Sequence, residues 1–352
     1  MTGRLRIGMI APPWLAVPPN GYGGTEVVID VLARALVGLG HEVVLFTTGD
    51  STCPVDRAWV VETGQGVDVG GSALEVHHVV SAYRQLVASG VDVIHDHTAL
   101  GPLYGQHHVA TPIVTTNHNP FAEPFRTAFA AMTEQVAIVA ISKDHARRAA
   151  PIPIAAVIHH GVDVDRFPVG SGHGGYVLFL GRLSEDKGAH RAVRIALAAG
   201  VRLLLAGRIQ TEREQAYFDE HVRPFLGPDV QFVGEVDQQT KLDLLSGASA
   251  LLNPIVWDEP FGMVMIEALA CGTPVLAMAN GAAGEIVEDG VTGVLATSEE
   301  QLIAALGSLP SIDRERCRSE AVARFSAARM AEQYLALYGE VIAAGRLSGA
   351  RR

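Results

Sequence analysis

Short runs of apolar residues alternate with segments of helical periodicity along nearly the whole chain. Strand candidates in the first half are residues 5–10, 43–47, 91–95, 113–116 and 136–141, and in the second half residues 176–180, 201–206, 230–233, 250–253 and 274–277. These runs are continuously apolar, which predicts parallel strands covered by helices on both faces. The pattern therefore predicts an α/β protein built from repeated strand–helix units.

The length of 352 residues fits two domains of ordinary size. Residues 168–175 are rich in glycine and separate two strand–helix series, so we expect the interdomain linker there. In the first series, Thr25 is expected to cap a helix that Gly40 ends. The tail from about Phe325 has helical periodicity again. Ligands of open parallel sheets bind beyond the carboxyl ends of the strands, so functional residues are expected at these ends.

Composition narrows the classes of partner. The net charge of −11, without a long Lys/Arg run, argues against nucleic acid and anionic membrane surfaces, although a small anion stays compatible. Cys53, Cys271 and Cys317 are far apart and predict free thiols in a reducing cytosol. We expect a cytoplasmic protein without stable membrane insertion, because the sequence shows neither a signal peptide nor an apolar run of roughly 18 residues. Only three of the 27 basic residues are lysines, a bias typical of GC-rich bacterial genomes.

The first strand leads into a glycine-rich loop, Asn-Gly-Tyr-Gly-Gly-Thr-Glu at residues 20–26. Gly23 and Gly24 let backbone N–H groups approach an anion, and the following helix adds its positive end. The dinucleotide fingerprint Gly-x-Gly-x-x-Gly does not occur at this strand end. The loop is thus a candidate phosphate site, and equally a flexible turn.

The corresponding loop of the second series is Gly-Arg-Leu-Ser-Glu-Asp-Lys-Gly at residues 181–188. Arg182 lies at a strand end and Lys187 is expected in the first turn of a helix, so both cations can converge on one diphosphate. Each charged hydrogen bond of this kind contributes roughly 1.5–3 kcal/mol. The alternative is that Arg182 and Lys187 pair with Glu185 and Asp186 on a solvated loop.

The most specific stretch is Glu-Pro-Phe-Gly-Met-Val-Met-Ile-Glu at residues 259–267, followed by Ala-Leu-Ala-Cys-Gly-Thr-Pro. Glu259 is expected in a loop over the strand ends, and Glu267 about one turn into a helix. One carboxylate can then hold sugar hydroxyls while the other accepts from both hydroxyls of a ribose. The amides of Gly262 and Met263 lie between them, where phosphates would bind. Two ordinary surface acids are the alternative, which the apolar Met-Val-Met-Ile disfavours.

The chain has 14 histidines, and no pair has the helical placement with acids that is typical of zinc enzymes, so no metal site is expected. His118 follows the strand 113–116 in Thr-Thr-Asn-His-Asn-Pro and is a candidate for ligand contact. Asp96 and His97 close another strand and are candidates for the acceptor side of a site. A lone histidine at such a position can equally be a structural core residue.

Together these motifs resemble the glycogen-synthase-like "group 1" glycosyltransferases, retaining enzymes of the GT-B fold, over nearly the whole length. The resemblance rests on Gly-Gly-Thr-Glu at 23–26, His118, Ser142, and the segments 160–167, 181–188, 232–235, 259–275 and 284–290. It implies an α/β fold of two Rossmann-like parallel-sheet domains facing across a cleft. These are an acceptor-side domain (1–168), a donor-binding domain (169–325) and a last helix (326–352) that returns to the first domain.

The resemblance also implies roles for single residues. Arg182 and Lys187 bind the donor diphosphate, and Glu267 binds the ribose. Glu259, with Phe261 and the amides of Gly262 and Met263, faces the transferred sugar and its phosphate. The backbone of Val233 and Gly234 lies by the base, His118 contacts the sugar, and the Gly23–Gly24 amides close on the phosphate. Catalysis is expected to depend on Glu259, His118, Arg182 and Lys187.

Two departures from the family pattern stand out. Position 160 is His where Asn is usual, and Asn253-Pro254-Ile255 replaces the usual Pro-Ser. Both concern the hinge and the loop before Glu259, so donor binding is little affected. The first domain is short for the family, so the family's acceptors are not transferable to this chain.

The expected reaction is transfer of a sugar from a UDP-, GDP- or dTDP-linked donor to an acceptor hydroxyl, with retention and without metal or cofactor. The finest assignment is the biosynthesis of an antibiotic oligosaccharide of the avilamycin type. One alternative is a nucleotide-sugar epimerase or hydrolase of the same fold. Another is a non-catalytic nucleotide-sugar-binding protein. The base, the sugar, the acceptor and the oligomeric state cannot be read from the sequence.

Overall fold

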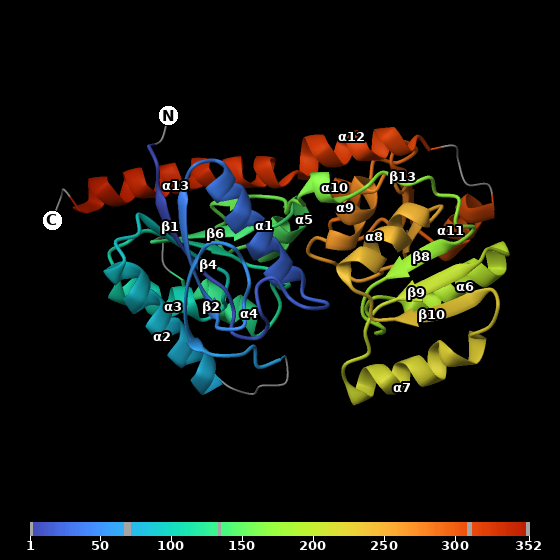
Figure 1. Cartoon of the computed structure of the whole chain (residues 1–352), viewed down its shortest axis with the longest axis horizontal. Coiled ribbons are helices and arrows are strands. Elements are labelled where there is room, and N and C mark those ends of the chain that lie inside the picture. The colour runs from blue at the N-terminus through green and yellow to red at the C-terminus, as the bar shows by residue number, and fades with distance from the viewer. Residues whose placement is uncertain (1–2, 67–71, 133–134, 308–311, 350–352) are drawn as a thin grey trace. The chain divides into compact units, whose positions relative to one another are not determined.

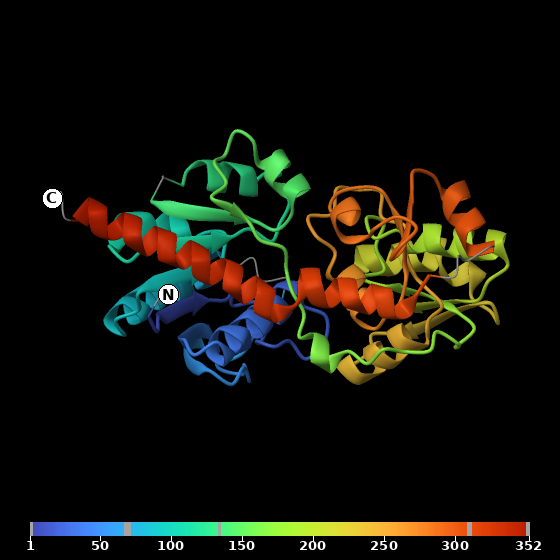
Figure 2. The ribbon, with the colours of Figure 1, turned by 90° about the horizontal axis from the view of Figure 1, so that it is seen from above.

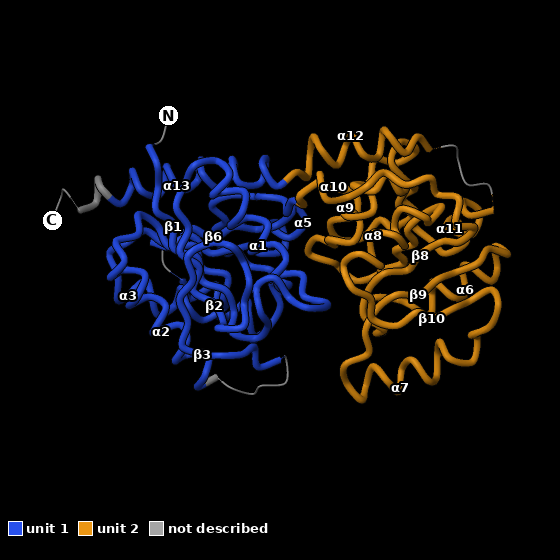
Figure 3. Tube along the Cα trace, viewed as in Figure 1, with its two compact units in different colours: residues 1–161, 327–352 blue, residues 162–326 orange. Residues whose placement is uncertain are grey.

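A computed structural model describes residues 3–66, 72–132, 135–307 and 312–349 (Figure 1). The chain forms two compact units, coloured separately in Figure 3. Unit 1 comprises residues 1–161 and 327–352, and unit 2 comprises residues 162–326. Each unit contains one sheet in which neighbouring strands run parallel, as the apolar runs predict.

The sheet of unit 1 has the strand order β3-β2-β1-β4-β5-β6-β7. Its strands in chain order are β1 (Arg6–Ile10), β2 (Glu42–Thr48), β3 (Asp56–Val61), β4 (Val93–Asp96), β5 (Ile113–Thr116), β6 (Val136–Ala140) and β7 (Ala156–Val157). The central strands β4 and β5 are buried at every position, because helices cover both faces. The sequence-based reading missed β3 and β7, since these edge strands are polar or very short.

The sheet of unit 2 has the order β10-β9-β8-β11-β12-β13. Its strands are β8 (Val177–Leu180), β9 (Leu203–Ala206), β10 (Val230–Gly234), β11 (Leu251–Asn253), β12 (Val275–Met278) and β13 (Gly293–Ala296). Every predicted strand of both units is present, with ends shifted by at most two residues, and β13 was missed. In both sheets the strand order reverses beside the first strand, between β1 and β4 and between β8 and β11. Such switch points are where open parallel sheets bind ligands.

Helices of unit 1 pack on the two faces of its sheet (Figure 1). They are α1 (Gly24–Gly38), α2 (Ser72–Ala88), α3 (Gly101–His108), α4 (Phe125–Ala130), α5 (Lys143–Ala149) and α13 (Ala327–Gly349). The prediction that Thr25 caps the first helix is wrong. Helix α1 begins at Gly24, and its N-cap Gly23 has no side chain to accept a hydrogen bond, so the first amides of α1 are not covered by a capping side chain.

Unit 2 contains α6 (Ala189–Ala199), α7 (Glu212–His221), α8 (Gln238–Gly247), α9 (Met263–Ala270), α10 (Ala283–Ile286), α11 (Glu299–Gly307) and α12 (Arg314–Phe325). Two short 3₁₀ turns, η1 (Val164–Arg166) and η2 (Arg223–Phe225), complete the described elements. Helices α6 and α11 pack together, as do α9 and α12. The core between the first pair and the sheet contains Phe179, Ile195, Leu205 and Leu302.

Helix α12 supplies arginines to the carboxyl ends of other helices in unit 2. Arg314 donates to the carbonyl oxygens of Ser246 in the last turn of α8 and of Ala248 just after it (both 3.1 Å), and to Cys271 O after α9 (3.4 Å). Arg318 donates to Ala270 O (2.6 Å). The last carbonyls of a helix lack intrahelical partners, so these guanidinium groups satisfy them and complement the helix dipoles.

The glycine-rich segment 168–175, expected as the linker, lies within unit 2. Its backbone N–H groups donate from Gly170 to Cys271 O (3.1 Å) and from Gly172 to Ser246 O (3.1 Å). Arg314 Nε donates to Gly170 O (2.7 Å), which joins the segment to α12. The chain passes between the units at Gly161–Val162 and again at Ser326–Ala327.

The last helix, α13, belongs to unit 1 and packs against α1 and β5 (Figure 2). Two buried tyrosines of α13 reach the strand ends. The Tyr334 hydroxyl is 2.8 Å from Thr116 Oγ1, and the Tyr338 hydroxyl is 2.7 Å from His95 Nδ1. Among the helices of the described residues, none is long and apolar enough to cross a membrane.

Candidate functional site

The loops at the switch point of unit 2 contain most of the residues singled out from the sequence. Arg182 follows β8, and Glu259 follows β11, the neighbour of β8 in the sheet. Helix α9 begins next in the chain, at Met263. The sheet order therefore explains why residues more than 70 positions apart in the chain meet.

Arg182 forms two ion pairs, with Nη1 at 3.0 Å from Glu214 Oε1 and Nη2 at 3.1 Å from Asp186 Oδ2. Glu214 is buried and its other oxygen accepts from Gln210 N and Thr211 N, so it is fixed at the start of α7. The guanidinium is thereby oriented while about a third of the Arg182 side chain stays exposed. The predicted alternative of pairing within the loop holds for Arg182 and Asp186.

Lys187 pairs with Glu259 and not with its loop neighbours. The distance from Lys187 Nζ to Glu259 Oε2 is 2.5 Å, and the ammonium lies 5.2 Å from the centre of the Trp257 ring. Both charged side chains are largely buried, at 13% and 16% exposed. The expectation that Lys187 lies in the first turn of a helix is wrong, because α6 starts at Ala189.

Gly188 between Lys187 and α6 has a left-handed backbone with φ +77°. A Cβ atom there would lie 2.9 Å from Pro254 O, so the loops after β8 and β11 approach each other closely. Both the backbone angle and the close approach favour glycine. This position brings Lys187 within reach of Glu259.

The backbone of Glu259 is held from two sides. Its N–H donates to Trp257 O (2.9 Å), and its carbonyl accepts from Ala282 N (3.1 Å) in the loop after β12. Gly281 lies close beside this carbonyl. A Cβ atom at position 281 would lie only 2.4 Å from Glu259 O, so the close approach requires glycine. The Glu259 carboxylate is thus positioned by its own backbone as well as by Lys187.

Helix α9 starts after Gly262, which has a left-handed backbone with φ +93°. This conformation favours glycine at the position. Met263 is the first helical residue, so its N–H and that of Gly262 belong to the positive end of the helix. Phe261 is buried and packs against Phe325 at the end of α12, with ring centres 6.2 Å apart. The buried packing of Phe261 sets the entry of the chain into α9.

Glu267 lies one turn into α9, as expected, and is buried. Its Oε1 is 2.6 Å from Lys241 Nζ, which belongs to α8. Lys241 was missed by the sequence-based reading. The sequence feature that could have identified Lys241 is the scarcity of lysine. Two of the three lysines of the chain pair with the two glutamates of this motif.

Val233 and Gly234 lie at the end of β10 on the same edge of the sheet. Val233 is exposed, and Gly234 turns the chain with φ +84°. Gly234 O accepts from Gly207 N (2.9 Å) after β9. The strand ends of β10, β9, β8 and β11 therefore form one continuous row.

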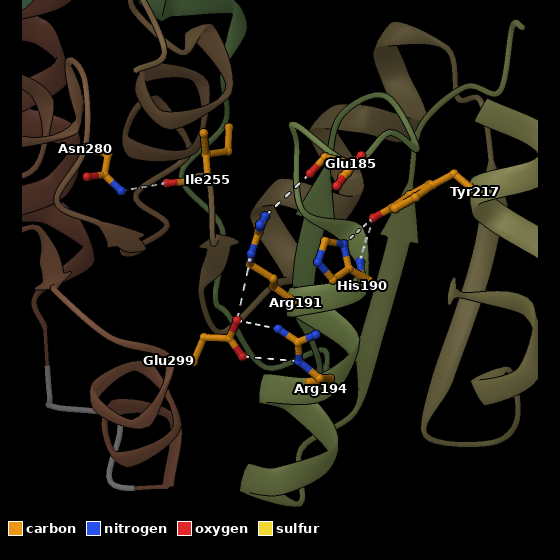
Figure 4. Close-up of polar contacts among 8 residues, drawn as sticks. All are labelled: Glu185, His190, Arg191, Arg194, Tyr217, Ile255, Asn280 and Glu299. Atoms are coloured by element: carbon orange, nitrogen blue, oxygen red, sulfur yellow. Dashed lines mark hydrogen bonds and ion pairs between the residues drawn. The ribbon is translucent and has the colours of Figure 1, made fainter. Parts of the chain in front are cut away.

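Behind this row, α6 is connected to α7 and α11 by the polar contacts in Figure 4. Arg194 Nη2 is 2.5 Å from Glu299 Oε1, and His190 Nδ1 is 2.6 Å from the Tyr217 hydroxyl. Arg191 Nη1 donates to Glu185 O (3.5 Å) in the loop that contains Arg182 and Lys187. These contacts support the loop from the α6 side.

At the switch point of unit 1, the loop after β1 is anchored by Ser51 next to β2. Ser51 Oγ accepts from Val17 N (2.8 Å) and is 2.9 Å from Thr47 Oγ1. Gly23 is crowded, since a Cβ there would lie 2.9 Å from Glu26 Oε2. A Cβ on Gly24 would meet no atom within 4 Å, so the start of α1 is open at this residue.

Asp96 is the last residue of β4, the neighbour of β1, and His97 follows it. Asp96 is fully buried and accepts from the Tyr83 hydroxyl (2.9 Å) and from Thr98 N (2.7 Å). Burial raises the pKa of Asp96 to about 7. The Asp96 side chain therefore lies in the interior of unit 1.

His118, after β5, joins His97 in a stack of four histidines. His97 Nδ1 is 2.9 Å from His118 Nε2. The stack runs His95, His97, His118 and His160, with successive ring centres 4.0, 5.2 and 5.1 Å apart. Desolvation by burial lowers the pKa of His95 and His118 to about 3 each, so the stack is neutral at pH 7. Within the described residues, no group of three or more His, Cys, Asp or Glu side chains could hold a metal ion.

Family comparisons cover both units. Residues 22–166 match "Glycosyltransferase Family 4", and residues 164–323 match "Glycosyl transferases group 1". The phosphatidyl-myo-inositol mannosyltransferase of Mycobacterium leprae is 28% identical over 97% of this chain and 98% of its own length.

Two solved structures show the same architecture. AviGT4, a glycosyltransferase involved in avilamycin A biosynthesis, is 28% identical with a TM-score of 0.73, covering 96% of this chain and 98% of AviGT4. The sucrose-phosphate synthase of Thermosynechococcus elongatus is 22% identical with a TM-score of 0.81, covering 97% of this chain and all of the other. The chain therefore belongs to the group 1, family 4 glycosyltransferases of the GT-B fold, retaining enzymes that use a nucleotide sugar.

Proposed function

We propose that unit 2 binds a nucleotide-diphosphate sugar at the switch point between β8 and β11. The observation that supports this most is the pair of lysine–glutamate contacts on either side of the α9 N-terminus, Lys187–Glu259 and Lys241–Glu267. In this assignment Arg182 and Lys187 bind the diphosphate, and Glu267 binds the ribose.

The transferred sugar is assigned to Glu259 and the amides of Gly262 and Met263. As the bond to the anomeric carbon breaks, negative charge grows on the leaving diphosphate. Arg182, Lys187 and the α9 amides stabilise this charge as it develops. For the sugar we propose a front-face route, in which the leaving phosphate helps to deprotonate the acceptor hydroxyl.

In unit 1 we assign the Gly23–Gly24 amides to the phosphate and His118 to the sugar, by the family resemblance. The open backbone at Gly24 and the neutral state of the histidine stack support these roles, since a neutral imidazole can both donate and accept a hydrogen bond. Asp96 and His97 are assigned to the acceptor side. Because Asp96 is buried, its assigned role is to order Thr98 and the loop after β4.

For the acceptor we propose an oligosaccharide in antibiotic biosynthesis. This rests on the likeness to AviGT4 at 28% identity. The mycobacterial mannosyltransferase named for phosphatidyl-myo-inositol is equally identical, so the two acceptor classes have to be compared directly.

The test is a screen of UDP-, GDP- and dTDP-sugars with small oligosaccharides and with phosphatidylinositol vesicles as acceptors, scoring transfer and hydrolysis separately. Transfer to oligosaccharides alone is the expected result. Transfer to the vesicles would refute the acceptor assignment, and hydrolysis or epimerisation alone would favour a different enzyme of this fold. Donor binding without turnover would indicate a binding protein.

A further inference from the structure

Lys241 of α8 forms an ion pair with Glu267 of α9, and the proposed donor site assigns a role to Glu267 but none to Lys241. Lys241 Nζ is 2.6 Å from Glu267 Oε1, and the two side chains are only 17% and 7% exposed. Removing two charges from water costs free energy, which a pair of this kind only offsets when its geometry is good. A pair this deeply buried is therefore a feature that needs an explanation.

Helix α8 itself does not explain the lysine. Lys241 is the fourth residue of α8, near the positive end of the helix, where the dipole disfavours a cation. The chain is also poor in lysine, with three among 27 basic residues, and two of these three contact Glu259 and Glu267. Both observations indicate that the lysine at position 241 is explained by its contact with Glu267 and not by a stabilising effect on α8.

The contact leaves defined acceptor positions on Glu267. A carboxylate has about four lone-pair sites, and Lys241 uses one of them on Oε1. Among the described residues, no other hydrogen bond or ion pair occupies Oε2 or the second site of Oε1, and the ion pair orients the carboxylate. Two neighbouring hydroxyls need two acceptor sites at such a fixed spacing.

The position of Lys241 is set from the strand side as well. After β10, Gly234 turns the chain, and the Asp237 side chain caps α8 by accepting from Thr240 N at 2.8 Å. Lys241 follows directly on this capped turn. The same short segment thus connects the strand end assigned to the base with the carboxylate assigned to the ribose.

We propose that Lys241 is a positioning residue that holds Glu267 so that it accepts from both hydroxyls of a ribose, which makes the donor site selective for ribonucleoside diphosphates over 2′-deoxyribonucleoside diphosphates. This inference rests on the proposed binding of a nucleotide-sugar donor in unit 2. It disfavours a dTDP-linked donor among the three nucleotide classes that the sequence leaves open.

The experiment measures dissociation constants by calorimetry for UDP, GDP and their 2′-deoxy counterparts. The variants are Lys241→Met, which keeps the length of the side chain, Lys241→Arg, which keeps the charge, and Glu267→Gln. Lys143→Met is the matched control, because it removes the same charge from an exposed position in unit 1. The ratio of the 2′-deoxy to the ribonucleotide dissociation constant is the readout, because partial misfolding lowers the apparent binding of both ligands alike.

The wild type and Lys143→Met should prefer the ribonucleotide by about tenfold or more, since the lost hydrogen bond involves a charged acceptor. Lys241→Met should reduce the ratio of the dissociation constants to about threefold or less, mainly by weakening the binding of the ribonucleotide. Lys241→Arg should restore most of the preference for the ribonucleotide. In the Glu267→Gln background, Lys241→Met should add little, as expected for two residues that act as one unit.

The outcomes separate the inference from the proposed function. If Glu267→Gln reduces the ratio and Lys241→Met does not, the role of Lys241 is refuted while the donor site stands. If Glu267→Gln leaves the ratio unchanged, or the wild type binds no ribonucleotide, the donor assignment fails and the inference fails with it. A wild type that binds the ribonucleoside and the 2′-deoxyribonucleoside diphosphates equally would also overturn the inference.

Discussion

At the scale of single residues, each glutamate of the motif meets a lysine from another element. Glu259 lies before α9 and contacts Lys187 from the loop after β8, and Glu267 lies in α9 and contacts Lys241 from α8. The first pair is assigned to the reacting end of the donor and the second to its ribose end. The two glutamates should therefore fail in different ways when they are replaced.

Glu259→Gln should chiefly lower kcat, because we assign the carboxylate to the sugar, where charge develops. A loss of about 2.7 kcal/mol of transition-state stabilisation corresponds to roughly a hundredfold in rate. Glu267→Ala should mainly raise KM, since the ribose changes little during the reaction. Steady-state kinetics with titration of the nucleoside diphosphate checks this. The reverse assignment, or equal effects of both variants, would refute the placement of the sugar.

Arg182→Ala and Lys187→Ala should each weaken the binding of a nucleoside diphosphate more than the binding of the free nucleoside, because both cations are assigned to the phosphates. The matched control is Arg213→Ala, whose side chain is 89% exposed and pairs loosely with Glu185 at 3.9 Å. It should change neither affinity. Calorimetry that gives equal losses for both ligands would place Arg182 and Lys187 elsewhere.

Turnover should persist in excess chelator, because we assign Arg182, Lys187 and the start of α9 to the diphosphate, where they would supply the positive charge that a metal otherwise provides. The measurement is the initial rate of transfer with and without EDTA. Activity that disappears with the chelator and returns with a divalent ion would contradict this prediction.

At the scale of elements, α12 connects the parts of unit 2 through its arginines. Arg314 donates to carbonyl oxygens of the segment 168–175, of the last turn of α8 and of Cys271 after α9, and also to Thr273 Oγ1 at 2.7 Å. Helix α9 is therefore fixed at its carboxyl end by α12, while Phe261 packs on Phe325 next to its amino end. The residues that we assign to the donor are therefore supported by a helix that contributes none of them.

Arg314→Leu should destabilise unit 2 by about 3 kcal/mol, because the carbonyl oxygens of Gly170 and Ala248 lose the donor that Arg314 supplies. Those of Ser246 and Cys271 lose one donor and keep the N–H groups of Gly172 and Gly170. Arg316→Leu on the same helix is the control, since Arg316 is 53% exposed and pairs with Glu320 four residues on. That change should cost about 0.5 kcal/mol or less. Urea unfolding that gives equal losses for the two variants would show that the carbonyl contacts of Arg314 contribute little.

At the scale of the whole molecule, the two units differ in how acid should affect them. Burial lowers the pKa of His78 and His145 to about 4, and that of His95 and His118 to about 3, all in unit 1. In unit 2, burial lowers the pKa of His190 to about 4, with Arg191 and Arg194 adding to the effect. Unit 1 therefore contains more histidines that must stay neutral in the folded state.

The free energy of unfolding of unit 1 should fall as the pH drops below 6.5, because the unfolded chain then binds protons that the folded histidines do not accept until about pH 3–4. Each such histidine contributes up to about 1.4 kcal/mol per pH unit. The buried Asp96, with a pKa of about 7, opposes this with one group. The stability that these histidines confer is thus complete above pH 6.5 and is lost on acidification.

The measurement is urea unfolding at pH 7.5 and pH 5, with tryptophan fluorescence as the probe. In a Trp14→Phe, Trp59→Phe double variant, Trp257 is the one remaining tryptophan of the sequence and reports on unit 2, whereas in a Trp257→Phe variant Trp14 and Trp59 report on unit 1. The transition of unit 1 should shift to lower urea between the two pH values by more than that of unit 2. Equal shifts would show that the histidine stack is not what makes the protein sensitive to acid.

The sequence by itself determined the strands, their parallel class and the placement of most candidate residues at strand ends. Continuous apolar runs need cover on both faces, and this local requirement is visible in the chain. Edge strands β3, β7 and β13 were missed, because short or half-polar edges have no such requirement. The N-cap of α1 was placed wrongly at Thr25, since Gly23 takes this position without a side-chain hydrogen bond.

Only the tertiary structure decided which charges meet. Lys187 reaches Glu259 across 72 positions because β8 and β11 are neighbours, and Lys241 reaches Glu267 because α8 lies against α9. Partner choice depends on strand order and helix packing, which hydrophobic periodicity does not encode. The same holds for His95, which lies between Thr116 and the Tyr338 hydroxyl of α13, 243 positions along the chain. Periodicity sets where a strand or helix forms, whereas pairing of side chains depends on how these elements pack.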